Sequence, residues 1–502
     1  MQYEEKSIIM KKSVSKFGLV IAAVALFGMG DVAAASRLWY KTAADDWMKA
    51  VPLGNGRIGA MVYGGDKCER IALNEISLWS GRHDETSNDL CGRDALDEMR
   101  RSFFAGDFDK GSELGDKYLN GRMTSFGTHV PLGDMTIEVE GRGDTKDYIR
   151  QLDLDEAVAT VRYKSGAITY TREYIADYPD DVLAMRFTAD KQKSLTATIG
   201  FDLLRDAQIK ASGNDLTLRG KVSFPLHGPG GVNFYGKLRV IPNGGKVENF
   251  GDKLRVVGAD SFDIVFDLRT NYGGDNYVAL CDVTVDKAAA KGYTEMRKSH
   301  VADYRKLYDR MTINLGDDSG DAIPTDERLK AISAGKSDPG FDALFFQYGR
   351  YMLISSSRKT PMPLCANLQG IWNDNRACNM PWTCDYHLDE NIQQNYWSAN
   401  RANLAECNEP LFAYLGLLAK HGRDTAMKMY GSRGWVAHTV CNAWGYTAPG
   451  WGVSWGMNVT GGAWLATHLW SHYKYTADKE YLRNTAYPIL REAALFFSDY
   501  MA

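Results

Sequence analysis

Apolar and polar side chains alternate along most of the chain between residues 36 and 285. Residues 262–268 place Phe, Ile, Phe and Leu at every second position, and residues 161–170 repeat this pattern on both sides of a Ser165-Gly166 turn. A period of two is typical of strands that bury one face, and the turn is typical of a hairpin. Many such short runs, separated by Gly, Asn and Asp, predict an antiparallel β-sandwich over residues 36–285.

The period changes to that of helices after residue 286. Residues 293–311 have a helical pattern, whereas residues 324–339 are polar and punctuated by Pro and Gly. We interpret residues 286–340 as a helical linker that follows the sandwich.

Residues 341–502 combine predicted helices with long loops rich in Trp, Asn and Gly. The helices are expected at residues 341–357, 410–420, 461–475 and 478–500. Helices joined by such loops indicate an α-toroid, in which loops at one end of a ring of helices form a pocket. The predicted helices are too few to close an (α/α)6 barrel, so we expect a multidomain β + α protein that ends in a truncated barrel.

The first 35 residues have the pattern of an export signal. Lys11 and Lys12 precede an apolar stretch at residues 17–29, and small residues lead to Ser36. This order is that of a secretory signal peptide, and the stretch is short for a membrane span. We expect residues 1–35 to be an N-terminal extension and signal peptide, and the protein to be periplasmic or extracellular. No second long apolar segment follows, so no membrane insertion is expected after the signal is removed.

Charge and aromatic content narrow the class of partner. The net charge of the 502 residues is only -4 and no long run of one sign occurs, which argues against a nucleic acid. Aromatic residues reach 12% and gather beside Asn, His and Gly in the second half of the chain. Sugar sites have this mixture, because rings stack on the C–H faces of a pyranose while polar groups bind its hydroxyls. A large helical core would also use these aromatic residues.

The cysteines give little support to a metal site. Eight cysteines are too few for a disulfide scaffold in a chain of this length, although export would permit disulfides. Four of them lie between residues 365 and 407, but no C-x-x-C pair occurs and His387 alone adds little to a zinc ligand set. Buried thiols or local disulfides are therefore expected, and no metal or cofactor is implied.

Two sequence blocks go beyond pattern. The first contains Val-Pro-Leu-Gly-Asn-Gly-Arg and Leu-Asn-Glu-Ile-Ser-Leu-Trp within residues 51–81. The second contains Asn-Leu-Gln-Gly-Ile-Trp-Asn and Asp-Tyr-His-Leu-Asp-Glu-Asn, and its parts follow one another at residues 366–373, 385–397, 403–412, 434–438 and 455–464. These blocks resemble the N-terminal sandwich domain and the start of the catalytic (α/α)6 barrel of glycoside hydrolase family 95, the α-L-fucosidases. The resemblance covers nearly all of residues 37–502.

The resemblance implies an exo-acting, inverting hydrolase that removes terminal α-L-fucose, commonly α-1,2 linked, from fucosylated glycans. Inversion needs a general acid and an activated water on opposite faces of the sugar, with the two carboxyl groups about 6.5–9.5 Å apart. In this family two asparagine side chains and a distant aspartate orient the water. An amide oxygen suits this role because it accepts a hydrogen bond without titrating near neutral pH.

Counting back from the Asn-Tyr-Trp sequence at residues 395–397 places the two water-holding positions at Asp389 and Asn391. Asn391 matches the family, whereas Asp389 departs from it, because the family has asparagine there. An ionised Asp389 can accept a hydrogen bond or a proton from water, or it can alter the pH dependence. Its alternative role is that of N-cap to the helical segment 391–400.

His387 lies two residues before Asp389, where fucose-preferring members also have histidine. Members that favour L-galactosides tend to have a smaller residue, which leaves room for the extra hydroxyl on C6. The resemblance therefore favours fucose, although a lone histidine is more often a structural hydrogen-bonding group. The other candidates for substrate binding have weaker support, and core packing is the main alternative: Trp372, Asn373, His438 and Trp455.

The family's general acid is a glutamate in a Ser-Pro-Glu-Asn-like motif, and its assisting aspartate lies in a later Asp-Gly-Asn-like motif. Neither motif occurs in these 502 residues. We therefore expect this chain alone to have little or no activity, since loss of a general acid lowers a rate by roughly 10² to 10⁴-fold. If that placement of the acid is wrong, the nearby carboxylates of Glu390, Glu406 and Glu409 are the groups to reconsider.

Three functional hypotheses follow from the sequence. The first is a fucosidase, with an α-L-galactosidase on the same scaffold as its close variant. The second is a non-catalytic glycan-binding remnant that keeps part of the pocket. The third, a structural sandwich with a helical appendage, is the weakest because the site motifs are retained.

Overall fold

The structure, a computed structural model, describes residues 36–90, 92–140, 143–224, 229–316 and 319–501. They belong to one compact unit, Ser36–Ala502. The predicted signal segment at residues 1–35 lies outside the described residues. Within the described ranges, no helix combines the length and the apolar character that crossing a bilayer requires.

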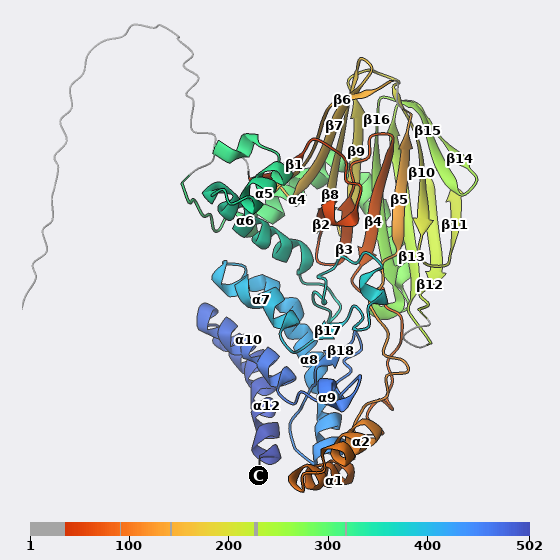
Figure 1. Ribbon diagram of the computed structural model, residues 1–502. Coiled ribbons are helices and arrows are strands. Elements are labelled where there is room, and N and C mark those ends of the chain that lie inside the picture. The colour runs from red at the N-terminus through yellow and green to blue at the C-terminus, as the bar shows by residue number, and fades with distance from the viewer. Residues whose placement is uncertain (1–35, 91, 141–142, 225–228, 317–318, 502) are drawn as a thin grey trace, which may run out of the picture. The chain divides into compact units, whose positions relative to one another are not determined.

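Two antiparallel sheets lie face to face in the first part of the unit (Figure 1). The strand orders are β1-β6-β7-β8-β9-β16-β13-β12-β11 and β14-β15-β10-β5-β4-β3-β2. The strands of the two sheets are β1 (Arg37–Tyr40), β2 (Val51–Gly54), β3 (Ile58–Val62), β4 (Cys68–Glu75), β5 (Gly133–Val139), β6 (Thr145–Asp153), β7 (Val158–Ser165), β8 (Ile168–Asp177), β9 (Val182–Ala189), β10 (Leu195–Leu203), β11 (Ala207–Ser212), β12 (Asp215–Lys221), β13 (Asn233–Asn243), β14 (Lys246–Phe250), β15 (Lys253–Ala259) and β16 (Ser261–Thr270). This arrangement confirms the predicted sandwich.

The alternation seen in the sequence has a direct structural counterpart. β7 and β8 form the predicted hairpin, in which Ser165 pairs with Ile168. On β16, Phe266 points into the space between the sheets and lies 5.8 Å from the ring of Phe201 on β10. Val265 points to the opposite face, where it is buried with Val285 of the first helix after the sandwich. Both faces of this strand are therefore covered.

Helices account for most of the second part of the unit, and two more lie between strands of the first part. They are α1 (Arg93–Phe104), α2 (Phe108–Tyr118), α3 (Tyr277–Lys291), α4 (Tyr293–Tyr308), α5 (Thr325–Ser333), α6 (Pro339–Ser356), α7 (Asn391–Arg401), α8 (Glu409–Thr425), α9 (Val453–Gly456), α10 (Gly461–Thr476), α11 (Lys479–Tyr481) and α12 (Tyr487–Tyr500). A π-helical segment, Leu482–Ala486, joins α11 to α12, so the predicted helix at residues 478–500 is present as one helical run. The polar stretch at residues 324–339 contains α5, which the sequence reading missed.

α1 and α2 depart from the predicted all-strand character of residues 36–285. Leu96, Met99 and Phe103 recur at helical spacing, and the first two are buried. The two helices lie in the connection from β4 to β5 and reach away from the sheets toward α9 and α12 (Figure 1). The guanidinium of Arg100 lies 5.2 Å from the ring of Tyr500 at the end of α12.

The β2–β3 hairpin joins the sandwich to the helical part. Gly56 on this hairpin donates its N–H to Ser355 O at the end of α6 (2.8 Å), and Tyr351 Oη donates to Pro52 O (2.6 Å). A Cβ at Gly59 would lie 2.8 Å from Ile371 O, which is closer than real side chains approach. The glycine-rich block of the sequence therefore forms the surface on which the helical part packs.

Candidate functional site

A short two-stranded sheet presents His387. β17 (Tyr386–His387) pairs with β18 (Val440–Cys441), with His387 opposite Val440. The next residue, Leu388, donates its N–H to Thr439 O (2.7 Å). This pairing brings the loop before α7 to the loop before α9, although some fifty residues separate them in the sequence.

Asp385 holds the His387 imidazole. Asp385 Oδ1 lies 2.9 Å from His387 Nε2, and Asp385 Oδ2 accepts a hydrogen bond from Thr383 Oγ1 (2.9 Å). Asp385 is fully buried and His387 is nearly so. Burial by itself would lower the pKa of His387, but the Asp385 carboxylate, with a smaller contribution from Asp389, raises that pKa above its ordinary value. The site therefore favours a charged, hydrogen-bond-donating His387.

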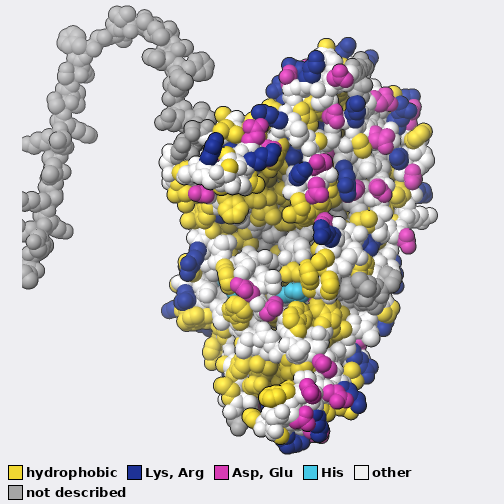
Figure 2. Space-filling view, in the orientation of Figure 1, with side chains coloured by type: hydrophobic (Ala, Val, Ile, Leu, Met, Phe, Trp, Pro, Cys, Tyr) yellow, Lys and Arg dark blue, Asp and Glu magenta, His cyan; other side chains and the backbone are white. Residues whose placement is uncertain are grey.

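Two tryptophans extend this group toward solvent. The rings of Trp451 and Trp455 stack with centroids 5.7 Å apart, and His387 meets Trp455 edge-on at 5.7 Å. Trp455 is 42% exposed, so one face of an aromatic platform is open beside the histidine. Such a platform can stack on the C–H face of a sugar ring. Figure 2 shows a histidine near the middle of one face of the molecule, with hydrophobic and acidic side chains around it.

Asp389 and Asn391 both lie at the surface, at the point where α7 begins. The residue between them, Glu390, has a φ of 136°, a left-handed conformation that costs a non-glycine residue roughly 1–3 kcal/mol. Glu390 occupies the N-cap position of α7 and makes no side-chain cap hydrogen bond. The alternative prediction, that Asp389 is the N-cap, is therefore wrong, and its carboxylate is accessible to water.

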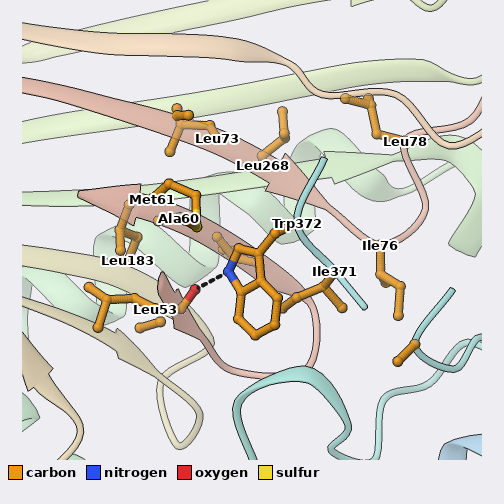
Figure 3. Close-up of a cluster of buried hydrophobic side chains, with 14 of the residues drawn as sticks. Leu53, Ala60, Met61, Leu73, Ile76, Leu78, Leu183, Leu268, Ile371 and Trp372 are labelled. Carbon is orange, nitrogen blue, oxygen red and sulfur yellow. Dashed lines mark hydrogen bonds between the residues drawn. The ribbon is translucent and has the colours of Figure 1, made fainter. Parts of the chain in front are cut away.

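Trp372 packs in the core and is only 3% exposed (Figure 3). Its indole Nε1 donates to Leu53 O (2.9 Å), and its ring lies among apolar side chains of the sandwich and of its own loop, as labelled in Figure 3. Asn373 is also buried: its Nδ2 donates to His129 O (2.8 Å) and its Oδ1 accepts from Asn375 N–H (2.9 Å). The structure thus gives both residues the packing contacts that were the alternative to substrate binding, and their role in binding stays a prediction.

His438 is buried as well. Its Nδ1 lies 2.6 Å from Thr447 O, and its Nε2 lies 2.7 Å from Tyr430 Oη. A carbonyl only accepts, so Nδ1 carries the proton and Nε2 accepts from the tyrosine. Burial lowers the pKa of His438 to about 4, which keeps the ring neutral. His438 therefore makes the structural contacts that were its alternative role, and its sugar contact stays a prediction.

The three carboxylates considered as alternative acids each interact with another side chain. Glu406 pairs with Arg310 at 2.9 Å and Glu409 pairs with Lys359 at 3.2 Å. Glu390 Oε1 accepts from Gln394 Nε2 along α7 (2.6 Å).

The cysteines of the described chain are free thiols, and all of them except Cys68 are buried. Burial raises the pKa of the Cys378 thiol to about 11, so it stays protonated. Cys91 lies outside the described residues. No group of three or more metal-ligating side chains occurs among the residues that the structure describes.

Two members of the group around His387 were missed by the sequence reading, namely Asp385 and Trp451. Asp385 could have been found because it is a carboxylate only two residues before His387, within the same sequence block. Trp451 carried a weaker signal, a tryptophan between two glycines. A separate cavity of about 310 Å³ lies beside α8 and is lined by His83, His421 and Trp444 among others. None of the predicted site residues lines it.

Both parts of the chain match known families. Residues 292–502 match the family model described as glycosyl hydrolase family 95 catalytic domain, and residues 38–275 match the one described as glycosyl hydrolase family 65, N-terminal domain. Alpha-L-fucosidase 2 of Arabidopsis thaliana is 34% identical over 95% of this chain and 60% of its own length. Probable alpha-fucosidase A of Aspergillus niger is 32% identical over 89% of this chain and 58% of its own length.

A solved structure supports the fold. The putative kojibiose phosphorylase from human microbiome superposes with a TM-score of 0.57 at 11% identity, covering 92% of this chain and 60% of that one. The expected fold, an antiparallel sandwich followed by helices of the (α/α)6 class, is thereby confirmed. This chain spans about three-fifths of the length of the relatives that it matches.

Proposed function

We propose that this protein, as a member of glycoside hydrolase family 95, releases terminal α-L-fucose from glycans.

 The linkage that we propose is α-1,2, with the fucose at the non-reducing end. The relatives named as fucosidases support the sugar, and the family supports the reaction class. The observation that carries the proposal is the His387 imidazole, which is held by Asp385 beside the open face of Trp455.

This arrangement suits a deoxy sugar. The C–H groups and the C5 methyl substituent of fucose are apolar and can lie on the Trp455 ring, while the charged imidazole donates a hydrogen bond to a hydroxyl. His387 fills its position almost completely, with 6% of its surface exposed. An extra hydroxyl on C6, as in L-galactose, would compete for that space, which supports fucose over L-galactose.

Asp389 and Asn391 are proposed to hold the attacking water. Both residues are at the surface, Asp389 is close enough to His387 for its charge to affect that ring, and both offer an oxygen that accepts a hydrogen bond. A water held by a carboxylate and an amide is oriented, and the carboxylate can take up its proton as the water attacks C1. Attack from the face opposite the leaving group gives inversion.

Sugar recognition is tested by titrating the chain with L-fucose, L-galactose and 2′-fucosyllactose, followed by calorimetry. We expect the fucose ligands to bind more tightly than L-galactose. Trp455→Ala should weaken fucose binding about tenfold, which corresponds to about 1.4 kcal/mol. Trp470→Ala is the matched control, because Trp470 is similarly exposed (48%) on α10. Equal affinity for all three ligands, or none, would contradict the proposed substrate.

The reaction is tested by following hydrolysis of 2′-fucosyllactose by proton NMR. Inversion predicts that β-L-fucose forms first and then mutarotates. Initial formation of α-L-fucose would show retention and remove the water-holding role from Asp389 and Asn391. Binding without release of fucose agrees with the expectation that these 502 residues lack the general acid, whereas release would assign that role to one of their own carboxylates.

A further inference from the structure

The connection from β4 to β5 reaches the loop that carries Trp451 and Trp455. We call residues 93–126, which include α1 and α2, the arm, and residues 449–457 the tryptophan loop. Figure 1 shows α1 and α2 far from the sheets that flank them in the sequence and close to α9, which lies in the tryptophan loop. The first part of the chain therefore supplies a support for aromatic residues of the second part.

The arm binds the backbone of the tryptophan loop at three successive points. Asp116 Oδ1 accepts a hydrogen bond from Val453 N–H (2.8 Å). Gly121 donates its N–H to Pro449 O (2.8 Å), and Met123 Sδ accepts from Trp451 N–H (3.2 Å). These contacts fix the loop on both sides of Trp451.

Side chains of the arm also pack against the tryptophan loop. The ring of Phe126 on the arm lies 5.6 Å from that of Trp451. A Cβ added at Gly115 would lie 3.1 Å from the Val453 side chain, so α2 and the loop are in close contact. Leu96 and Met99 of α1 belong to the same buried apolar cluster as residues of the loop.

The loop needs outside support because its conformation is strained. Trp451 has a φ of 56°, in the left-handed region that costs a residue with a side chain free energy. α9 begins at Val453, and its N-cap, Gly452, has no side chain to satisfy the first free N–H groups of the helix. Asp116 on α2 supplies the missing acceptor from a distant part of the sequence.

We propose that the arm positions the sugar platform: Asp116 and Met123 hold the tryptophan loop in the conformation that stacks Trp451 and Trp455 beside His387. The inference rests on the proposed function in giving these rings a sugar contact. Asp116 is a positioning residue, because it acts through the loop and not on the sugar. The arm thereby makes sugar affinity depend on a segment of the N-terminal part.

Hydrogen exchange of the 502-residue chain tests the support of the loop. Asp116→Ala should speed amide exchange in residues 449–457 about fivefold, as expected for the loss of one hydrogen bond. Asp116→Asn should restore slow exchange, because its amide oxygen can still accept from Val453 N–H. Glu113→Ala is the control: Glu113 is an exposed carboxylate one turn earlier on α2, and no hydrogen bond from it to the loop is found in the described chain. Unchanged exchange in Asp116→Ala would overturn the inference.

Calorimetric titration with 2′-fucosyllactose tests the consequence for the sugar. We expect Asp116→Ala to bind about fivefold more weakly and Asp116→Asn to bind as the unchanged protein does. If Trp455→Ala loses affinity while Asp116→Ala does not, the proposed function stands and the positioning role is overturned. If the unchanged protein binds no fucoside, the proposed function fails, and the exchange result decides by itself whether the arm holds the loop.

Discussion

Asp385 directly precedes the short strand β17 that carries His387, and the pairing of the two side chains sets the charge of the candidate site. The pKa of His387 is raised in the folded protein, above its ordinary value near 6.5, because the carboxylate outweighs the effect of burial. Stability from this pair is therefore fully present below pH 6.5 and is lost as the pH rises through the folded-state pKa. Any hydrogen bond that a charged His387 gives to the sugar has the same pH dependence.

Asp385→Asn should lower the pKa of His387, because it removes the opposing charge and leaves burial unopposed. The affinity for fucose should then fall at a lower pH than in the unchanged protein. An NMR titration of the His387 ring proton and a pH series of binding constants measure the two effects. Asp389→Asn is the comparison, with a smaller expected decrease, since the Asp389 charge contributes less. An unchanged titration in Asp385→Asn would show that the pair does not control the histidine.

The roles of single residues within the two sequence blocks were the hardest to predict. His387 and Trp372 both stood in blocks that resemble the family, yet one lies beside an open aromatic face and the other is enclosed by the sandwich. A sequence block shows which residues belong to a structure, but not which side of a loop each side chain takes. Asp389 and Asn391 lie at the surface where α7 begins, and their water-holding role stays a prediction.

At the scale of elements, the β2–β3 hairpin shows why a glycine-rich block can be structural. Gly59→Ala should lower the free energy of unfolding by about 1–3 kcal/mol, because the new Cβ meets the backbone of Ile371 at 2.8 Å. Gly349→Ala is the matched control on α6, where a Cβ meets nothing within 4 Å and alanine favours the helix. It should raise the free energy of unfolding by about 0.5–1 kcal/mol. Urea denaturation measures the free energy of unfolding of both variants. An unchanged value for Gly59→Ala would mean that the hairpin and the loop at Ile371 do not pack closely.

The periodicity of the sequence predicted some helices and missed others. Helices such as α6 and α10 were predicted to within two residues, because their boundaries carry Pro, Gly or a capping residue. α1 and α2 were missed because they interrupt a long series of strands, and the surface that they cover belongs to a distant part of the chain. Local pattern identifies an element, but its partner determines whether its apolar face is buried.

For the whole molecule, the sequence suggested a sandwich, a linker and a barrel region with boundaries at residues 285 and 340. These boundaries stay predictions. The contacts across them are extensive: a single apolar cluster contains residues of β2, α6, α8 and α10. Trp372 contributes to it from the helical part and hydrogen-bonds to the backbone of β2. The composition of a linker indicates its local structure, but it does not predict the contacts between the parts that the linker joins.

We therefore expect residues 36–502 to unfold in one cooperative transition, because the shared core leaves neither part with a complete interior of its own. Differential scanning calorimetry should give one peak, and far-ultraviolet circular dichroism and tryptophan fluorescence should report the same midpoint. Gly59→Ala disturbs the contact between the β2–β3 hairpin and the helical part, so it should shift the midpoint reported by both probes. Independent domains would show the shift in only one of them. Two separated peaks, or a stable sandwich fragment after limited proteolysis, would show that the parts fold separately.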